Sequence, residues 1–224
     1  MPPITQPALF ELLEASTGAM ELFPAVWSAA EGLVSSEVKT RLAALAWLVE
    51  LNAQRLSPLV AYLVATRLAD PDLEMRHQVV QVLGDLLTLD KEGRTADENV
   101  RQTIATYLSQ MRTRLVFSLL QVAEKFSDID ANIARLFNAC PYAGEHLVEI
   151  LSDRNNALAI RQKAIYFVGL VGYLDAIPAL EHLENRLEAR LSGQQTMPFT
   201  QASTLDEEDL LPTIKKTLIS LRAP

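Results

Sequence analysis

The stretch "IRQKAIYFVGLVGYLDAIPALEHL", residues 160–183, places one arginine ahead of a nearly unbroken apolar run that contains two glycines. The most apolar part, from Ala164 to Leu174, is far shorter than the about 20 residues that a membrane-spanning helix needs. An aspartate ends the run and a proline follows shortly after, as is typical where one helix stops and the next begins. A helix that is apolar nearly all round is expected to be buried between neighbouring helices.

The same pattern occurs earlier in the chain. The segment "EMRHQVVQVLGDLLTLD" (74–90) aligns with "AIRQKAIYFVGLVGYLD" (159–175), and each has an arginine near its start and a glycine eight residues further on. The two arginines, Arg76 and Arg161, are 85 residues apart, which is about two periods of the known helix-pair repeats. The stretch quoted first is therefore interpreted as one unit of a repeat.

A third copy begins at "VKTRLAALAWLVEL" (38–51), which we align with Lys39 at the arginine position and Trp47 at the glycine position. An arginine in the first turn of a helix is unfavourably placed for the helix dipole. We therefore expect it to have a partner carboxylate or to bind the last carbonyls of a neighbouring repeat. Four aspartates lie in the expected loops between helices: Asp70, Asp90, Asp153 and Asp175.

Glycines inside these helices also indicate close packing. A glycine within a helix costs about 1 kcal/mol relative to alanine, so Gly84 and Gly169 are expected where another helix approaches closely. Gly172 is expected just past the end of its helix, in the left-handed conformation that glycine adopts readily.

Apolar residues at helical spacing recur along the chain and sustained strict alternation is absent, so the sequence predicts an all-α protein. The segment 96–125 is expected to break near 110–113. The chain is predicted to be one domain, with a mobile loop at 192–205. Helices are expected over residues 7–17, 22–34, 37–53, 58–69, 72–89, 96–125, 128–139, 142–152, 157–173, 176–191 and 206–222.

Helix-capping residues support several of these boundaries. Ser57 is expected to cap a helix that begins with a first-turn proline, and Asp70, which also precedes a proline, is expected to cap the next helix. Two pairs have the spacing of a capping box: Thr95 with Glu98 and Thr204 with Glu207.

These segments resemble HEAT repeats, and most closely the short bacterial variety first named from phycobilisome lyases. The resemblance is carried by "DPDLEMRHQVVQVLGDL" (70–86) and by "DRNNALAIRQKAIYFVGLVGYLDAIPALEHL" (153–183). It implies an α-α superhelix, a solenoid of about five antiparallel helix pairs plus a C-terminal end helix. In this arrangement residues 1–35 form N-terminal capping helices, 36–191 form the repeats, and 206–222 form a C-terminal capping helix.

The composition narrows the classes of function. Charged residues make up 21% of the chain and the formal net charge is −8, which opposes binding to phosphate backbones or anionic lipid. The single cysteine, Cys140, excludes an internal disulfide and is expected to be a small buried residue. The start of the chain has no basic region ahead of an apolar one, so we expect a cytoplasmic protein without a secretory signal.

The HEAT family is mainly one of binding scaffolds, but it includes enzymes. The repeated His-Glu pairs of deoxyhypusine hydroxylase are absent, since none of His77, His146 and His182 precedes a glutamate. Cys140 and His146 are close in sequence, but six residues of separation do not define a catalytic dyad. No lyase-specific residue is identified either, so we expect no catalytic residue, no metal and no cofactor.

The family also includes alkylpurine DNA glycosylases, which hold DNA on a basic concave surface. The densest basic cluster here, Arg112 and Arg114 with Arg101 upstream, is small against the about six to ten phosphate contacts of typical binders. Trp27 and Trp47 lie among apolar helical neighbours and are expected in the core rather than as base-stacking platforms. We therefore expect neither nucleic acid nor membrane as a partner.

The favoured function is a non-enzymatic scaffold or adaptor that binds a protein partner on the concave face of the solenoid. The alternative is a HEAT-type enzyme or enzyme accessory, bilin-lyase-like or DNA-glycosylase-like. Self-association into a homo-oligomer is left open. The candidate partner-binding residues lie at one-face spacing on the expected second helices: Tyr62, Thr66, Tyr107, Gln110, Arg114, Glu181, Asn185 and Glu188.

Overall fold

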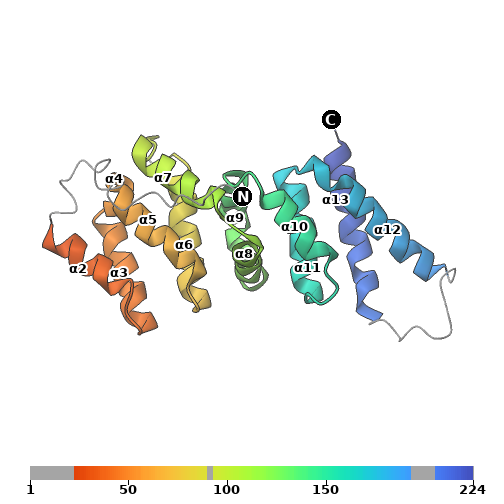
Figure 1. Ribbon diagram of the computed structural model, residues 1–224, viewed down its shortest axis with the longest axis horizontal. Helices are drawn as coiled ribbons and strands as arrows, with labels where there is room; N and C mark the ends of the chain where they lie inside the picture. The colour runs from red at the N-terminus through yellow and green to blue at the C-terminus, as the bar shows by residue number, and fades with distance from the viewer. Residues whose placement is uncertain (1–22, 90–92, 193–204, 224) are drawn as a thin grey trace, which may run out of the picture. The chain divides into compact units, whose positions relative to one another are not determined.

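The computed structural model describes residues 23–89, 93–192 and 205–223 (Figure 1). Within these ranges every regular element is helical and no strand occurs, so the all-α prediction is confirmed. None of the described helices is both long and apolar enough to cross a membrane. The helix expected over 7–17 and most of the loop expected over 192–205 lie outside the described residues.

The chain divides into two compact units. The first unit consists of Met1–Gln110 and Asp128–Ala139, and the second consists of Met111–Ser127 and Cys140–Pro224. The single-domain prediction stays a prediction.

The first unit contains seven α-helices among its described residues: α2 (Pro24–Gly32), α3 (Val38–Glu50), α4 (Ala53–Leu56), α5 (Pro58–Thr66), α6 (Leu73–Leu86), α7 (Glu98–Ser109) and α9 (Asp130–Asn138). A 3-10 turn, Arg67–Ala69, follows α5. Helix α2 packs against α3, α3 against α6, α5 against α7, and α6 against α9. Fully buried side chains such as Leu48, Val79 and Ile104 fill these contacts, so the core runs from helix to helix along the unit.

The second unit contains five α-helices among its described residues: α8 (Thr113–Lys125), α10 (Ala143–Ser152), α11 (Leu158–Val171), α12 (Ile177–Leu191) and α13 (Leu211–Arg222). Two 3-10 segments, Leu174–Ala176 and Leu205–Leu210, precede α12 and α13. Helix α11 contacts α8, α10 and α13, and α12 packs against α13 (Figure 1). These three neighbours bury Ile165, Phe167 and Val168, but Tyr166 and Leu170 of the same helix are exposed, so the expected burial on all sides is found only in part.

Most expected helix boundaries agree with the structure to within a few residues. The predicted break in 96–125 is confirmed, since α7 ends at Ser109 and α8 begins at Thr113. The segment expected as one helix over 37–53 is interrupted, because Asn52 has φ 57°, which ends α3 and starts α4. The last helix was expected from 206, but this region begins as a 3-10 segment and becomes α-helical only at Leu211, next to a proline in its first turn.

Two of the predicted helix caps were wrong by a few residues. Ser57 caps α5 as expected, accepting a hydrogen bond from the backbone N–H of the third residue of the helix at 3.1 Å. Helix α6 is capped by Asp72 instead of Asp70, and α7 is capped by Asp97 instead of Thr95. Asp70 has another role, because its carboxylate is buried against an arginine. Thr204 lies outside the described residues.

Three helices have an arginine as their fourth residue, the position at which the predicted repeat places one. Arg41 of α3, Arg76 of α6 and Arg161 of α11 occupy this position, and all three are buried. The alignment of the third copy was therefore wrong by two residues. Lys39 is exposed, and the match to Arg76 is Arg41. The corrected register also removes Trp47 from the glycine position.

The glycine predictions are confirmed. A Cβ atom on Gly84 would lie 2.5 Å from Cγ of Asn132 on α9, and one on Gly169 would lie 3.1 Å from Cγ2 of Thr217 on α13. Glycine at these positions lets a neighbouring helix approach the backbone closely. Gly172 has φ 74° and follows the last residue of α11, as expected for a left-handed helix end.

Candidate functional site

Two buried arginines at the repeat position form buried ion pairs in different ways. In the first unit, Arg41 Nη2 donates to Oδ1 of Asp70 at 2.8 Å, and Arg41 Nη1 donates to the carbonyls of Ser35 and Ser36 at 3.0 and 3.1 Å. One arginine thus meets one loop aspartate and two carbonyls of the loop between α2 and α3. The predicted carboxylate partner is present, whereas the carbonyls belong to a loop and are not the last carbonyls of a helix.

In the second unit the equivalent arginine pairs with a glutamate that the sequence did not single out as its partner. Arg161 Nε donates to the Leu151 carbonyl at 2.9 Å, and Arg161 Nη2 donates to Oε1 of Glu207 at 2.9 Å. The side chains of Arg161 and Glu207 are only 4% and 7% exposed, so this pair is withdrawn from solvent. Asp153, one of the loop aspartates proposed as partners, instead accepts hydrogen bonds from Asn155.

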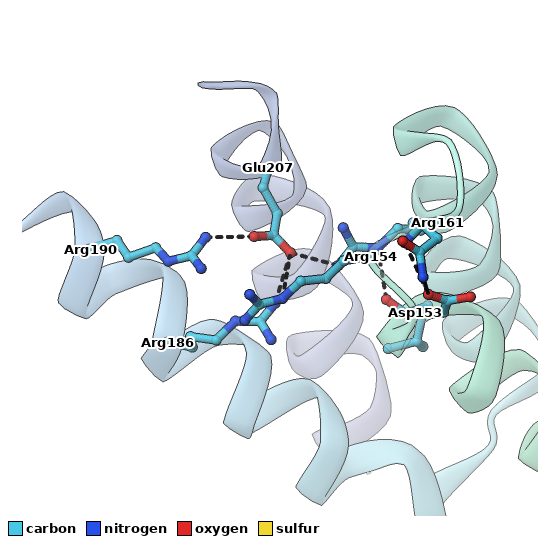
Figure 2. Close-up of polar contacts among 8 residues, drawn as sticks. Asp153, Arg154, Arg161, Arg186, Arg190 and Glu207 are labelled. Carbon is cyan, nitrogen blue, oxygen red and sulfur yellow. Dashed lines mark hydrogen bonds and ion pairs between the residues drawn. The ribbon is translucent and has the colours of Figure 1, made fainter. Parts of the chain in front are cut away.

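Three more arginines surround the same carboxylate, and we refer to Arg154, Arg161, Arg186 and Arg190 as the arginine cluster. Arg186 Nη2 donates to Oε1 of Glu207 at 2.8 Å, and Arg190 Nη1 donates to Oε2 at 2.6 Å. Arg154 Nε lies 4.0 Å from Oε1. Figure 2 shows the guanidinium groups converging on Glu207 from α12, from α11 and from the loop after α10.

The elements position these side chains for simple reasons. Arg186 and Arg190 are four residues apart on α12, so they lie on the same face of that helix. Glu207 lies in the 3-10 segment that precedes α13, and α13 packs against both α11 and α12. The carboxylate is therefore held where the arginines of α11 and α12 can reach it.

The electrostatics of the cluster follow from burial and from its uneven charge. Burial raises the pKa of Glu207, but hydrogen bonds from Arg161 and Arg190 and the charges of Arg161 and Arg186 outweigh it, so the net pKa lies below the ordinary value of 4.5. Burial lowers the pKa of Arg186, and the charges of Arg154, Arg190 and Arg161 oppose the attraction of Glu207. The cluster thus has more positive charge than its one carboxylate balances.

The chemistry available to this cluster is recognition of anions. A guanidinium group has five N–H donors and no acceptor, and it stays protonated in proteins. Arginines therefore bind carboxylates and phosphates through directed, often bidentate hydrogen bonds, but they do not exchange protons as general acids or bases.

The predicted partner-binding tyrosines lie together in the first unit. The rings of Tyr62 on α5 and Tyr107 on α7 meet edge to face, with centroids 5.9 Å apart. Burial raises the pKa of Tyr107 and neighbouring Tyr62 adds to the shift. The Thr66 hydroxyl donates to a carbonyl of its own helix at 2.6 Å. Gln110 and Arg114 are exposed, and they belong to different units.

The acidic residues proposed on α12 are largely engaged with α13. Glu181 pairs with Arg222, and Glu188 Oε1 lies 2.7 Å from Nζ of Lys215. Asn185, between them on the same helix, is exposed. Two of the three proposed contacts on this helix are thus used within the second unit.

A threonine, a histidine and a glutamate also meet in the second unit. Thr113 Oγ1 lies 2.9 Å from Nδ1 of His146 and donates to Oε2 of Glu149 at 2.6 Å. A catalytic triad needs the imidazole between the hydroxyl and the carboxylate. Here the hydroxyl lies between the other two, so the contact joins the first residue of α8 to α10 without the order that activates a nucleophile.

Other candidate chemistry is limited in the described part of the chain. It holds no group of three or more His, Cys, Asp or Glu side chains that could bind a metal. Cys140 is 4% exposed, which confirms its predicted burial. Burial raises the pKa of the Cys140 thiol, although hydrogen bonds from the Tyr142 and Ala143 backbone oppose this shift, so the thiolate is disfavoured.

Two more differences from the sequence-based expectations concern the tryptophans and the arginine cluster. Trp27 and Trp47 were expected in the core, but each is 55% exposed. The arginine cluster was missed, although "ENRLEARL" (184–191) places two arginines four residues apart. The sequence suggested Glu207 only as part of a capping box, because its partners are 17 to 46 residues away in the chain.

Comparison with known proteins adds no assignment. No protein-family model matches the chain, and no curated protein or solved structure matches it either.

Proposed function

We propose that the protein is a non-enzymatic scaffold of the HEAT-like kind, an α-solenoid that binds another protein and has no cofactor of its own. Two observations support an architecture of stacked helix pairs. Three helices have a buried arginine at the same position, and neighbouring helices pack closely against Gly84 and Gly169. Such stacks present long surfaces for partners.

The observation that carries this proposal is the exposure of both tryptophans. The chain has two, Trp27 and Trp47, and each is 55% exposed. Tryptophan is highly buried on average, and exposed tryptophans are enriched among the residues that dominate protein–protein binding. Phe23 and Val34, which flank α2, are also exposed, at 57% and 67%. The start of the first unit therefore offers a partner several large apolar side chains.

The packing of α2 on α3 places both tryptophans toward the same end of this helix pair. The two helices approach each other closely at Gly32, where a Cβ would lie 2.8 Å from Cβ of Ala44. At a rise of 1.5 Å per residue, Trp27 lies about 7.5 Å from Gly32 along α2, and Trp47 lies about 4.5 Å from Ala44 along α3. Both tryptophans are displaced away from the loop that connects the two helices. This arrangement favours one partner that contacts both side chains.

The tyrosines and polar residues on the later helices remain candidates for additional contacts. Tyr62 and Tyr107 each pack against the other's ring, so their role is divided between internal packing and contact with a partner. Gln110, Arg114 and Asn185 are exposed and available.

The proposal is tested by purifying the tagged full chain from its own cells and identifying what copurifies. We expect a stoichiometric protein partner, and we expect it to be lost in the Trp27→Ser, Trp47→Ser double variant. The matched control is Tyr142→Ser, an aromatic residue of the second unit with 54% exposure. Circular dichroism should show that both variants keep their helix content. Retention of the partner by the double variant would contradict the role of the tryptophans.

A further inference from the structure

We infer that the arginine cluster binds a phosphate group, held by Arg154, Arg186 and Arg190 at the side of the cluster that reaches solvent. This inference goes beyond the proposed scaffold function and does not depend on it. The phosphate is either inorganic phosphate or a phosphorylated side chain, which present the same oxyanion.

The arginine cluster holds more positive than negative charge. Four guanidinium groups share the single carboxylate of Glu207, so positive charges outnumber the one negative charge within these contacts. Mutual repulsion among arginines is relieved by a bound anion. A phosphate monoester carries about −1.5 to −2 charges and three acceptor oxygens, which match this surplus better than a second carboxylate does.

The arginine cluster has N–H donors that Glu207 does not use. Arg161, Arg186 and Arg190 each give Glu207 one hydrogen bond out of the five N–H donors that a guanidinium group carries. The Arg186 Nε atom is buried, and no atom of the described residues accepts its hydrogen. Arg41 and Arg101 also have a buried Nε atom without an acceptor, so this donor by itself does not mark a ligand site, but at Arg186 it lies in the cluster where an anion could accept from it.

Three of the four arginines of the cluster are partly exposed to solvent. Arg161 and Glu207 are 4% and 7% exposed and form the inner part of the site. The side chains of Arg154, Arg186 and Arg190 are 52%, 20% and 23% exposed, so each keeps its charge partly open to water. In Figure 2 Arg190 reaches one oxygen of the carboxylate, while Arg154 and Arg186 lie together at the other oxygen.

The first unit provides an internal comparison. There Arg41 donates to Asp70 and to two backbone carbonyls. A second arginine, Arg76, is also attracted by the charge of Asp70. The carboxylate of the first unit thus acts on two arginines, whereas four surround Glu207. The three added around Glu207 exceed what holding Arg161 requires, and a ligand explains them.

The test uses the intact chain and inorganic phosphate as the probe, at constant ionic strength set with sodium chloride. We expect phosphate to raise the melting temperature along a saturable curve, with matching binding heats in titration calorimetry. The Arg154→Gln, Arg190→Gln double variant should bind phosphate at least about tenfold more weakly, because it loses two charged donors. The control is the Arg135→Gln, Lys216→Gln double variant, which removes the same number of positive charges from exposed positions elsewhere.

The outcomes distinguish specific phosphate binding at the cluster from nonspecific screening of surface charges by anions. A linear response that chloride reproduces, or an equal loss in both double variants, would overturn the inference and leave only nonspecific anion effects. A phosphoserine peptide that binds more tightly than inorganic phosphate would identify the source as a modified protein, and equal or weaker peptide binding would identify free phosphate. Because Trp27 and Trp47 are left unchanged in these variants, failure here does not alter the tryptophan test of the scaffold function.

Discussion

Removing the carboxylate of Asp70 should destabilise the first unit strongly. Its side chain is 1% exposed and the side chain of its partner Arg41 is 6% exposed, with 2.8 Å between Oδ1 and Nη2. The Asp70→Ala variant leaves a buried guanidinium group without its counter-charge. Breaking a buried ion pair in this way costs about 3–5 kcal/mol of unfolding free energy. Because the carbonyls of Ser35 and Ser36 still accept from Arg41, we expect a loss of about 3 kcal/mol, at the lower end of that range.

The assay is urea denaturation followed by circular dichroism, combined with hydrogen exchange resolved to peptides. Exchange is needed because the chain has two compact units, and the loss should appear in α3 and α6 of the first unit. The matched control is Glu98→Gln, which removes a carboxylate that is 73% exposed and pairs with Arg101 on the same helix. An exposed pair of this kind contributes less than about 1 kcal/mol.

A second variant distinguishes loss of the ion pair from a destabilisation that any substitution of Asp70 would cause. Replacing both partners, as in Arg41→Met with Asp70→Leu, removes the unpaired charge and should recover much of the lost stability. The reasoning is refuted if Asp70→Ala unfolds within about 1 kcal/mol of the parent chain. It is also refuted if the double variant is no more stable than Asp70→Ala.

Three further predictions follow from the described residues. The pKa of Glu207 lies below 4.5 in the folded chain, so its stabilising effect is fully present above about pH 4.5. This stabilisation is lost as the pH falls through the lower pKa of the folded chain. The Glu207→Gln variant should therefore show a flatter dependence of unfolding free energy on pH in this range. Gly84→Ala places a Cβ 2.5 Å from Asn132 and should lower the unfolding free energy by about 1–3 kcal/mol in urea titrations, whereas an unchanged midpoint would disprove the close contact. Cys140 is 4% exposed with a raised pKa, so iodoacetamide should modify it far more slowly in the folded chain than in urea, and equal rates would contradict its burial.

Local patterns predicted the helices well because they depend on neighbouring residues. The break between α7 and α8 and the left-handed Gly172 after α11 both follow from signals within a few residues. The third repeat was misaligned because Lys39 and Arg41 are both basic and lie two residues apart. Burial distinguishes them, and burial depends on the helices packed around α3.

Features made by distant contacts were not predictable from one sequence. Trp47 has apolar neighbours in the chain, but no described helix covers the face on which it lies, and its side chain is exposed. Arg161 and Glu207 are 46 residues apart, and only the packing of α13 on α11 brings them together. Helical periodicity places each residue on a face of its own helix, but it does not state which other helix meets that face.

The most direct test of the scaffold proposal is affinity purification of the full chain from its own cells after chemical cross-linking, with mass spectrometry of what is recovered. The account predicts a stoichiometric protein partner cross-linked to α2 or α3, for which Lys39 offers an exposed amine on the same helix as Trp47. Recovery of a bound pigment, metal or nucleic acid without any protein partner would contradict it.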